Sequence, residues 1–376
     1  MWIVWIIAII VVLLIAENLR ELHMFVVTRY RLSSPKLAGL RENMKIIVLS
    51  DLHDRSYGMG NEKLLAAIRL ENPDAIMVVG DMLVARKPSS YIKVQAFMTE
   101  LVKICPTYYS NGNHEQRLKE YPEVYGSYEE YVKELLAAGI QLLGNDSVYM
   151  REHSVRIRIS GLELSNEAYR RYGRRAVSAK EVRNLLGEAN LDSYQILLAH
   201  DPAHYPAYKR WGADLVLSGH THGGIIRIPN WRGVITPQGR LFPKYSGGLY
   251  KEGSQAFVVS RGLGTHTVNV RLLNQPELIV LTLSGKDNEP PLQKELPTHR
   301  RNIFRDSVGE KSSKPEADAK ILKHDKGVKA ARQKDQSDDL KPARQKDQSD
   351  DLKPANQAKS IRSVTTPQKN ERKKKK

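Results

Sequence analysis

Seven Asp, Asn and His residues follow short apolar runs of the sequence and could bind metal ions. The runs are KIIVLS, AIMVVG, PTYYS, ILLA and ADLVLS, and the seven residues are Asp51, His53, Asp81, Asn113, His200, His220 and His222. Each run is expected to be a buried strand, and in a parallel sheet the side chains beyond the strand ends gather at one edge. The sequence therefore predicts a metal site at that edge.

The types and number of these side chains restrict the metals that they could bind. Oxygen and imidazole ligands without thiolate suit Mn, Fe, Zn, Ni or Co, and among these we favour Mn. Seven ligands are too many for one tetrahedral ion, but they suit two ions that share a bridging carboxylate. The single cysteine, Cys105, excludes a cysteine metal site and an intrachain disulfide.

The short motifs that contain these residues differ in specificity. A lone D-x-H or Gly-Asp is common in solvated loops, whereas GNHE and GHTH are rarer, and the sequence contains all of them in order. An ordered set of five, each after a predicted strand, favours a functional site over a series of loop residues.

The elements that must position these residues are visible in the hydrophobic pattern. Helices are expected over residues 61–70 and 91–104, between the first three strands, and over 128–138, after the third strand. Further strands are expected near 155–160, 195–199, 214–217, 256–260 and 278–283. The early alternation of strand and helix favours an α/β fold with a parallel sheet, in one folded region over residues 45–284.

The order D-x-H, GD, GNHE, H, GHTH resembles the calcineurin-like metallophosphoesterase superfamily over about Lys45 to Leu283. The forms SDLH, LLAHDP and SGHTHGG are similar to those of membrane-associated bacterial phosphodiesterases, a branch similar to UDP-2,3-diacylglucosamine hydrolases. The resemblance implies two mixed sheets packed face to face between helices, an α-β-β-α sandwich. It implies two divalent metal ions, one held by Asp51, His53 and His222, the other by Asn113, His200 and His220, with Asp81 bridging.

The resemblance also implies a reaction. A metal-activated hydroxide would attack a phosphodiester or pyrophosphate, and His114 of GNHE would stabilise the transition state or protonate the leaving oxygen. Asp54 and Asp201 are either residues that orient the imidazoles of His53 and His200 or solvated loop carboxylates. The aromatic and basic stretch from Tyr169 to Arg175 is either a rim over the site or a loop face without a role.

The N-terminus is expected to anchor the protein in a membrane. Residues 1–16 carry no charged side chain, and the exit through Ala16 and Glu17 lacks the features of a signal-peptide cleavage site. A buried core helix is disfavoured because apolar residues cover every face. We expect an anchor helix over 1–22, a juxtamembrane linker over 23–44 and, because Arg20, Arg29, Arg31 and Lys36 follow the apolar run, a catalytic domain on the cytoplasmic side of the cell membrane.

The C-terminus has a different composition and carries most of the charge. Of the net +17, residues 286–376 contribute +10, and the unit ARQKDQSDDLKP occurs twice in succession at 331–354. One leucine per unit cannot offset chain entropy, so residues 285–376 are expected to be a disordered basic tail. The tail is either a solvated segment or an adhesion segment for anionic lipid, polymer or nucleic acid.

The anchor favours membrane lipids and a lipid-linked or nucleotide-linked phosphate substrate such as UDP-2,3-diacylglucosamine. An alternative is a nucleic-acid phosphodiesterase, which the modest charge of the folded region and the apolar anchor argue against. The other alternative is a non-catalytic membrane-tethered scaffold that acts through the tail, which the full set of ligand residues argues against.

Overall fold

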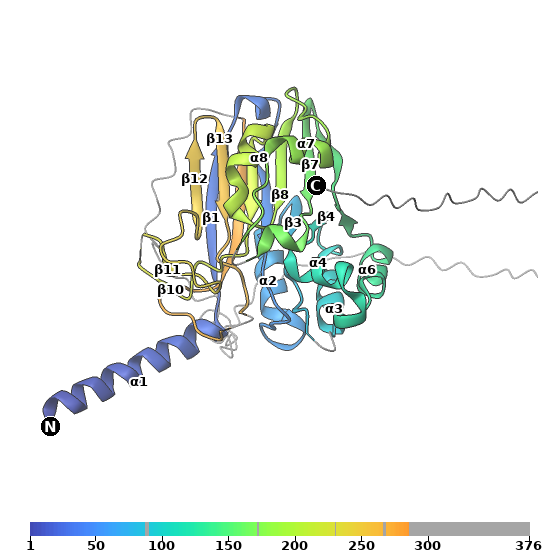
Figure 1. The fold of residues 1–376 in the computed structure, drawn as a ribbon. Coiled ribbons are helices and arrows are strands. Elements are labelled where there is room, and N and C mark those ends of the chain that lie inside the picture. The colour runs from blue at the N-terminus through green and yellow to red at the C-terminus, as the bar shows by residue number, and fades with distance from the viewer. Residues whose placement is uncertain (87–89, 171–172, 230, 266–267, 286–376) are drawn as a thin grey trace, which may run out of the picture. The chain divides into compact units, whose positions relative to one another are not determined.

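The computed structural model describes residues 1–285 except 87–89, 171–172, 230 and 266–267. Two six-stranded sheets form its centre, with a short β10–β11 hairpin at one end (Figure 1). The first sheet runs in the order β1 (Val26–Ser33), β14 (Glu277–Ser284), β2 (Met44–Leu49), β3 (Ala75–Val79), β4 (Thr107–Ser110) and β5 (Gln141–Leu142). The second runs β12 (Gly248–Glu252), β13 (Gln255–Val259), β9 (Leu215–Ser218), β8 (Tyr194–Ala199), β7 (Val155–Leu162) and β6 (Asp146–Glu152). The hairpin strands are β10 (Ile226–Arg227) and β11 (Gly233–Ile235).

Both sheets are mixed, which confirms the α-β-β-α architecture. In the first sheet β14 runs antiparallel to β2, while β2, β3, β4 and β5 are parallel to one another. In the second sheet β7, β8, β9 and β13 are parallel, and β6 and β12 flank them as antiparallel edges. The parallel order expected from the early alternation of strand and helix holds for β2 to β5, whereas β6, β12 and β14 each pair antiparallel with a neighbour.

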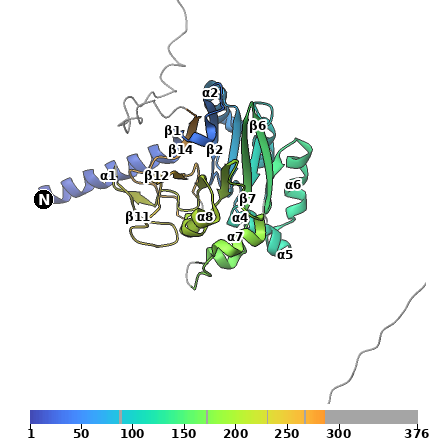
Figure 2. The same cartoon turned by 90° about the horizontal axis from the view of Figure 1, so that it is seen from above.

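The helices cover the outer faces of the sheets. The first sheet carries α2 (Glu62–Glu71), α3 (Ile92–Leu101) and α6 (Tyr128–Ala137), and the second carries α7 (Ala179–Leu186) and α8 (Tyr205–Trp211). Two further helices, α4 (Asn113–Glu120) and α5 (Pro122–Tyr125), follow β4 (Figure 2). Four 3-10 turns complete the described part: η1 (Pro35–Leu37), η2 (Met59–Asn61), η3 (Asn166–Tyr169) and η4 (Pro202–His204).

The β2 sequence MKIIVL shows why a continuous apolar run forms a central strand here. Ile46 and Val48 face the second sheet and pack in the core between the two sheets. Ile47 and Leu49 face the other way and pack against the first sheet's helices. Because both faces of the strand are covered, every side chain after Lys45 is apolar and the usual alternation disappears.

Residues 26–33 differ from the linker predicted over 23–44. They form β1, which pairs in parallel with β14 over its whole length, from Val26 opposite Glu277 to Ser33 opposite Ser284. The alternation of polar and apolar residues in VVTRYRLS is typical of an edge strand with one covered face. The folded region therefore begins before residue 45, since β1 belongs to the first sheet.

Helix α1 (Trp2–His23) is the one helix of the described residues that is long and apolar enough to cross a membrane. Its mean hydropathy reaches 2.5 over an 18-residue window, none of which is buried. Its last turn is different, because Glu21 and Leu22 are buried in the folded domain. The predicted tail lies outside the described residues apart from Gly285.

Candidate metal centre

The structure brings all seven predicted ligand residues together at one end of the two sheets. Five strands deliver them: β2 leads to Asp51 and His53, β3 to Asp81, β4 to Asn113, β8 to His200, and β9 to His220 and His222. None of the seven is more than 6% exposed. Buried ionisable groups in such density are costly unless they are paired or bind a cation.

The backbone at this cluster is in an unusual conformation. Asp51, His53, Asp81, His220 and His222 all have φ between 50° and 66°, the left-handed region that non-glycine residues rarely occupy. Each such residue costs of order 1 kcal/mol and persists where the surroundings enforce it. Left-handed turns directly after the strands therefore direct these side chains to a common point.

Two glycines allow the loops to approach closely enough. A Cβ on Gly219 would lie 1.9 Å from Ser50 Oγ and 2.3 Å from Asp51 Oδ2. A Cβ on Gly112 would lie 2.3 Å from Asp81 Oδ1. The glycines of the GNHE and GHTH motifs thus make room for the two buried carboxylates.

The first group of potential ligands consists of Asp51, His53 and His222. The Nε2 atoms of His53 and His222 lie 3.1 Å apart, and Asp51 Oδ1 lies 3.4 Å from that of His222. The Nδ1 atom of His53 faces the Leu83 carbonyl at 3.3 Å, and that of His222 faces the Gly264 carbonyl at 3.0 Å. Because a carbonyl can only accept, each Nδ1 carries the ring proton and each Nε2 of the neutral ring presents a lone pair.

The second group consists of Asp81, His200 and His220, with Asn113 beside them. His200 Nδ1 donates to the Val79 carbonyl at 2.7 Å, so its Nε2 presents a lone pair, 3.2 Å from Asp81 Oδ2. That Nε2 is buried without a hydrogen-bond partner. His220 Nδ1 donates to Asn113 Oδ1 at 2.7 Å in the neutral ring, so an ion held by these two atoms would take the place of that proton.

The two groups together fit divalent cations. Lone pairs of two imidazoles face one another, and those of a third face a carboxylate, which is unfavourable without a positive charge between them. Burial raises the pKa of Asp51 to about 7, although His200 opposes this shift. Burial would also lower the pKa of His200, but Asp81 and Asp51 outweigh it and raise the pKa to about 10. In the metal-free protein a proton on His200 thus supplies positive charge beside the two carboxylates, and a bound cation would take the place of that proton.

His114 lies in the cluster but is held differently from the predicted ligands. Its Nδ1 accepts a hydrogen bond from the Ala85 amide at 2.9 Å, which leaves the proton of the neutral ring on Nε2. This Nε2 lies 4.0 Å from Asp81 Oδ2, and the ring is 2% exposed. The position also allows a grouping of His114 with His53 and Asp81 around one ion. An Nε2–H group, however, suits a proton donor better than a metal ligand.

The predicted roles of Asp54 and Asp201 are not supported by the contacts. The Nδ1 atoms of His53 and His200 face the Leu83 and Val79 carbonyls, so neither ring is oriented by the adjacent carboxylate. Asp54 instead accepts a hydrogen bond from the Val84 amide, and Asp201 caps η4 by accepting from the Ala203 amide. Neighbours in the chain point in different directions here because the ligand backbone turns sharply. Asp54 and Asp201 therefore fix the backbone of their loops and do not orient the imidazole rings of His53 and His200.

Two further polar residues support the cluster and were not expected. Glu115 is fully buried and accepts hydrogen bonds from the Asp81, Met82 and Gly112 amides, which ties the loops after β3 and β4 together. Gln238 places its Nε2 atom 3.3 Å from His220 Nε2 and donates to the His220 carbonyl. Glu115 belongs to the GNHE motif and could have been identified from the sequence, whereas Gln238 lies in no such motif.

The stretch from Tyr169 to Arg175 contributes to the site from one side. The Tyr169 ring lies 5.5 Å from that of His220 and is buried. Arg174 forms an ion pair with Asp201 at 3.1 Å. Arg171 and Tyr172 lie outside the described residues. Tyr169 therefore packs against a candidate ligand, which an exposed loop face without a role would not do.

Comparison with known proteins gives the family. Residues 44–224 match the sequence model of the calcineurin-like phosphoesterases. The chain is 29% identical over 278 residues to the uncharacterized metallophosphoesterase YkuE of Bacillus subtilis, covering 70% of this chain and 87% of that protein. It is 25% identical over 263 residues to the phosphodiesterase YaeI of Escherichia coli, covering 68% and 88%.

A solved structure, that of phosphopantetheinyl hydrolase from Mycobacterium tuberculosis, aligns with 59% of this chain and 90% of its own at 14% identity and a TM-score of 0.37. The family match spans the strands that carry all seven candidate ligands. Residues 44–224 of this chain therefore form a calcineurin-like phosphoesterase domain, and the protein is a hydrolase that acts on phosphoric esters.

Proposed function

We propose that the protein is a binuclear metal-dependent phosphodiesterase or pyrophosphatase. Asp51, His53 and His222 would hold one divalent ion, and Asn113, His200 and His220 the other, with Asp81 between them. The observation that carries the proposal is the 3.1 Å approach of the His53 and His222 Nε2 lone pairs beside a buried carboxylate. Among the metals that suit oxygen and imidazole ligands without thiolate, which are Mn, Fe, Zn, Ni and Co, we favour manganese.

Two divalent ions held by these residues would supply Lewis acidity for a phosphoryl group and for an attacking water. The chain's own groups do the rest. His114 presents its Nε2–H toward the space beside Asp81, where it can donate to a phosphoryl or leaving-group oxygen. The Ala85 amide fixes the tautomer that makes this donation possible. Burial of the whole cluster excludes bulk water and strengthens each electrostatic contact.

We propose that the substrate is a lipid-linked or nucleotide-lipid phosphate, of which UDP-2,3-diacylglucosamine is an example. Support comes from α1, which would hold the domain at a membrane, and from similarity to a protein named as a phosphodiesterase. The basic tail does not decide between lipid and nucleic acid, because it lies outside the described residues.

The activity is tested by hydrolysis of bis-p-nitrophenyl phosphate with and without added Mn²⁺. Asp81→Asn removes the carboxylate shared by the two ligand groups, and we expect turnover to be lost. Asp192→Asn is a matched control because Asp192 is exposed in a loop at the opposite end of β8 from His200. Full activity of purified, Mn²⁺-loaded Asp81→Asn protein would refute the site assignment.

The substrate class is tested by presenting lipid-linked diphosphates, phospholipids and single-stranded DNA to the same preparation. Release of a phosphate-containing product from the lipids supports the proposal. Cleavage of DNA alone would favour the nuclease alternative, and inactivity toward all substrates would favour the scaffold.

A further inference from the structure

A group of large apolar side chains is exposed at the end of the domain that carries the β10–β11 hairpin. These side chains are between 38% and 67% exposed, and the group consists of Ile226, Ile228, Trp231, Leu241, Phe242, Val268 and Leu273. Trp231 and Phe242 pack against each other with ring centroids 6.0 Å apart, so they form one surface. Exposed apolar side chains gathered on this hairpin and on the segments beside it indicate a binding partner. We call these seven residues the hairpin face.

The hairpin face is continuous with the base of α1. Segment 271–274 links the two, because the Arg271 amide donates to Asn18 and the Asn274 amide donates to Glu21. The other side of this segment pairs with β10, where the Arg227 amide donates to the Leu272 carbonyl. Figures 1 and 2 both show the hairpin beside the point where α1 leaves the domain. The apolar surface of α1 and the hairpin face therefore meet at the same end of the domain.

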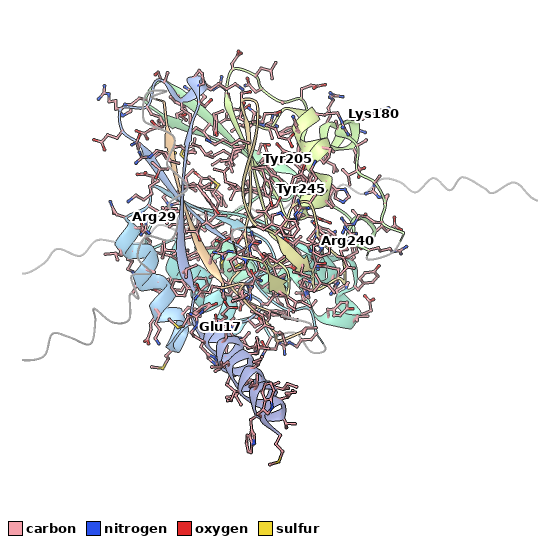
Figure 3. All side chains as sticks on the ribbon, turned by 90° about the vertical axis from the view of Figure 1, so that its left-hand side faces the viewer. Glu17, Arg29, Lys180, Tyr205, Arg240 and Tyr245 are labelled. Carbon is pink, nitrogen blue, oxygen red and sulfur yellow. The ribbon has the colours of Figure 1, made fainter. Side chains whose placement is uncertain are left out.

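The stretch of chain that carries the hairpin has only positive charges. The sequence contains no Asp or Glu between Asp214 and Glu252, whereas Arg227, Arg232, Arg240 and Lys244 all lie in this stretch. The Arg232 guanidinium lies 4.8 Å from the Trp231 ring centroid, so a charge sits directly beside the apolar surface. In Figure 3, Arg240 lies nearer to Glu17 and the α1 end than Lys180 does. Aromatic and aliphatic side chains edged by arginine and lysine are typical of proteins that rest in an anionic membrane surface.

The hairpin face also leads to the metal centre. A pocket beside His222 is lined by Ile225, Pro237, Val268 and Val270, together with Arg271. Val268 belongs both to this pocket and to the hairpin face. The hairpin face therefore borders, at Val268, the pocket that His222 lines, and Thr265 and Arg271 are polar residues of that lining.

We infer that the hairpin face rests in the headgroup layer of an anionic lipid bilayer, and that the substrate's apolar part enters the site along it. Entry of the substrate along the hairpin face rests on the proposed phosphodiesterase activity, whereas contact of this face with the bilayer does not. A second copy of this chain is the competing occupant. The bilayer is favoured because two copies would bring the same arginines and lysines together across the contact.

The position of the hairpin face is tested by fluorescence quenching of Trp231. The full-length protein, carrying Trp2→Phe and Trp5→Phe, is reconstituted in phosphatidylglycerol–phosphatidylcholine vesicles whose phosphatidylcholine is brominated on the acyl chains. We expect strong quenching that is lost in Trp231→Phe, since the remaining Trp211 is buried. As a control, Leu191→Trp in the Trp231→Phe background reports the opposite end of β8, where Leu191 is 72% exposed, and should be insensitive to bromine.

Three results would overturn the inference. Quenching of Trp231 by acrylamide in water but not by brominated lipid would place the hairpin face in solvent. Insensitivity to both quenchers, with a dimer in sedimentation, would assign it to a second copy. Equal bromine quenching at residues 191 and 231 would mean that the whole domain, rather than this face, meets lipid.

Substrate entry is tested with two chromogenic diesters, soluble bis-p-nitrophenyl phosphate and vesicle-borne hexadecyl p-nitrophenyl phosphate. The triple variant Trp231→Ser, Leu241→Ser, Phe242→Ser should hydrolyse the soluble ester normally. It should lose about tenfold or more on the vesicle ester, the loss expected if part of one large apolar contact is removed. Leu191→Ser is the matched control and should leave both rates unchanged.

The two proposals fail in different ways. Hydrolysis of neither ester by the unmodified protein, with bromine quenching of Trp231 retained, would refute the phosphodiesterase and leave the membrane contact standing. Hydrolysis of both esters at normal rates by the triple variant would refute only substrate entry along the hairpin face, and the phosphodiesterase activity would stand.

Discussion

His53 and His222 are 169 positions apart in the chain, yet their Nε2 atoms lie 3.1 Å from each other with stacked rings. Each ring donates from Nδ1 to a backbone carbonyl, of Leu83 and of Gly264 respectively. The pair is thus held in place by the chain with both lone pairs directed at one point. A cation bound there would relieve the repulsion and link the loops after β2 and β9.

Removal of metal should therefore destabilise the protein. We expect EDTA treatment to lower the melting temperature by several degrees and Mn²⁺ to restore it, because an ion that binds only the folded state adds its binding free energy to stability. Differential scanning calorimetry at fixed protein concentration measures the shift. His53→Ala should weaken the response to Mn²⁺. An unchanged melting temperature after complete chelation, verified by metal analysis, would argue against a metal at this pair.

His114 and His220 should respond differently to replacement by alanine. His114→Ala should keep metal content and lose about 10²–10⁴-fold in turnover, the usual contribution of a positioned proton donor. His220→Ala should lose metal as well as activity, because His220 Nδ1 lies beside Asn113 Oδ1 at the second group. Metal content by mass spectrometry and hydrolysis of bis-p-nitrophenyl phosphate distinguish the two. Loss of metal from His114→Ala would make it a ligand.

Glu115 should stabilise the fold independently of metal. Glu115→Ala leaves the Asp81, Met82 and Gly112 amides without their acceptor in a buried position. We expect the free energy of unfolding to fall by about 3 kcal/mol or more, since hydrogen bonds to charged groups contribute about 1.5–3 kcal/mol each and are not additive. Urea unfolding of the metal-free proteins gives the value. Glu134→Ala, on the exposed side of α6, is the control and should change it by less than about 0.5 kcal/mol.

Gln238 should position His220. Gln238→Ala removes the amide that lies 3.3 Å from His220 Nε2, and we expect metal affinity to fall about 10–100-fold, as for other residues that orient a metal-binding imidazole. Competition with a fluorescent chelator measures the affinity. Unchanged affinity with unchanged turnover would show that Tyr169, which packs on the same ring, is sufficient.

The buried pair of Glu277 and Arg261 should make stability depend on pH. Burial would raise the pKa of Glu277, but the Arg261 guanidinium, at 2.6 Å, and hydrogen bonds including that from Thr28 outweigh burial and lower it. A lowered folded pKa gives stability that is present above the unfolded pKa of about 4.3 and is lost as pH falls through the folded value. Glu277→Gln should therefore be less stable than the unmodified protein at pH 7, and the difference should shrink below about pH 4. A difference that does not depend on pH would contradict this.

The strands and ligand residues could be predicted from sequence because each central strand is buried on both faces. Its apolar run is uninterrupted, so the polar residue that ends it is conspicuous, as Asp51 is after KIIVLS. β1 and β6 were less visible, since each lies at a sheet edge and mixes polar with apolar residues. β1 was consequently predicted as part of a linker.

The supporting contacts could not be predicted from sequence, because they depend on residues distant in the chain. His200 is held by the Val79 carbonyl, 121 positions away, and a carbonyl leaves no trace in the choice of residue. The expectation that Asp54 and Asp201 orient neighbouring imidazoles relied on chain proximity. The left-handed backbone at His53 and the η4 turn after His200 direct those carboxylates elsewhere.

The pairing of β1 with β14 has a consequence for how the chain is made. Thr28 and Glu277, which meet in this pair, are 249 residues apart. At a synthesis rate of about 5–20 residues per second, β14 is synthesised roughly 12–50 s after β1. During that time α1 has already emerged and can enter a bilayer, while the adjacent strand has an open edge. If α1 anchors the protein as proposed, the order of synthesis lets it insert before the first sheet is complete, and an aggregation-prone edge then lies close to the membrane until β14 arrives.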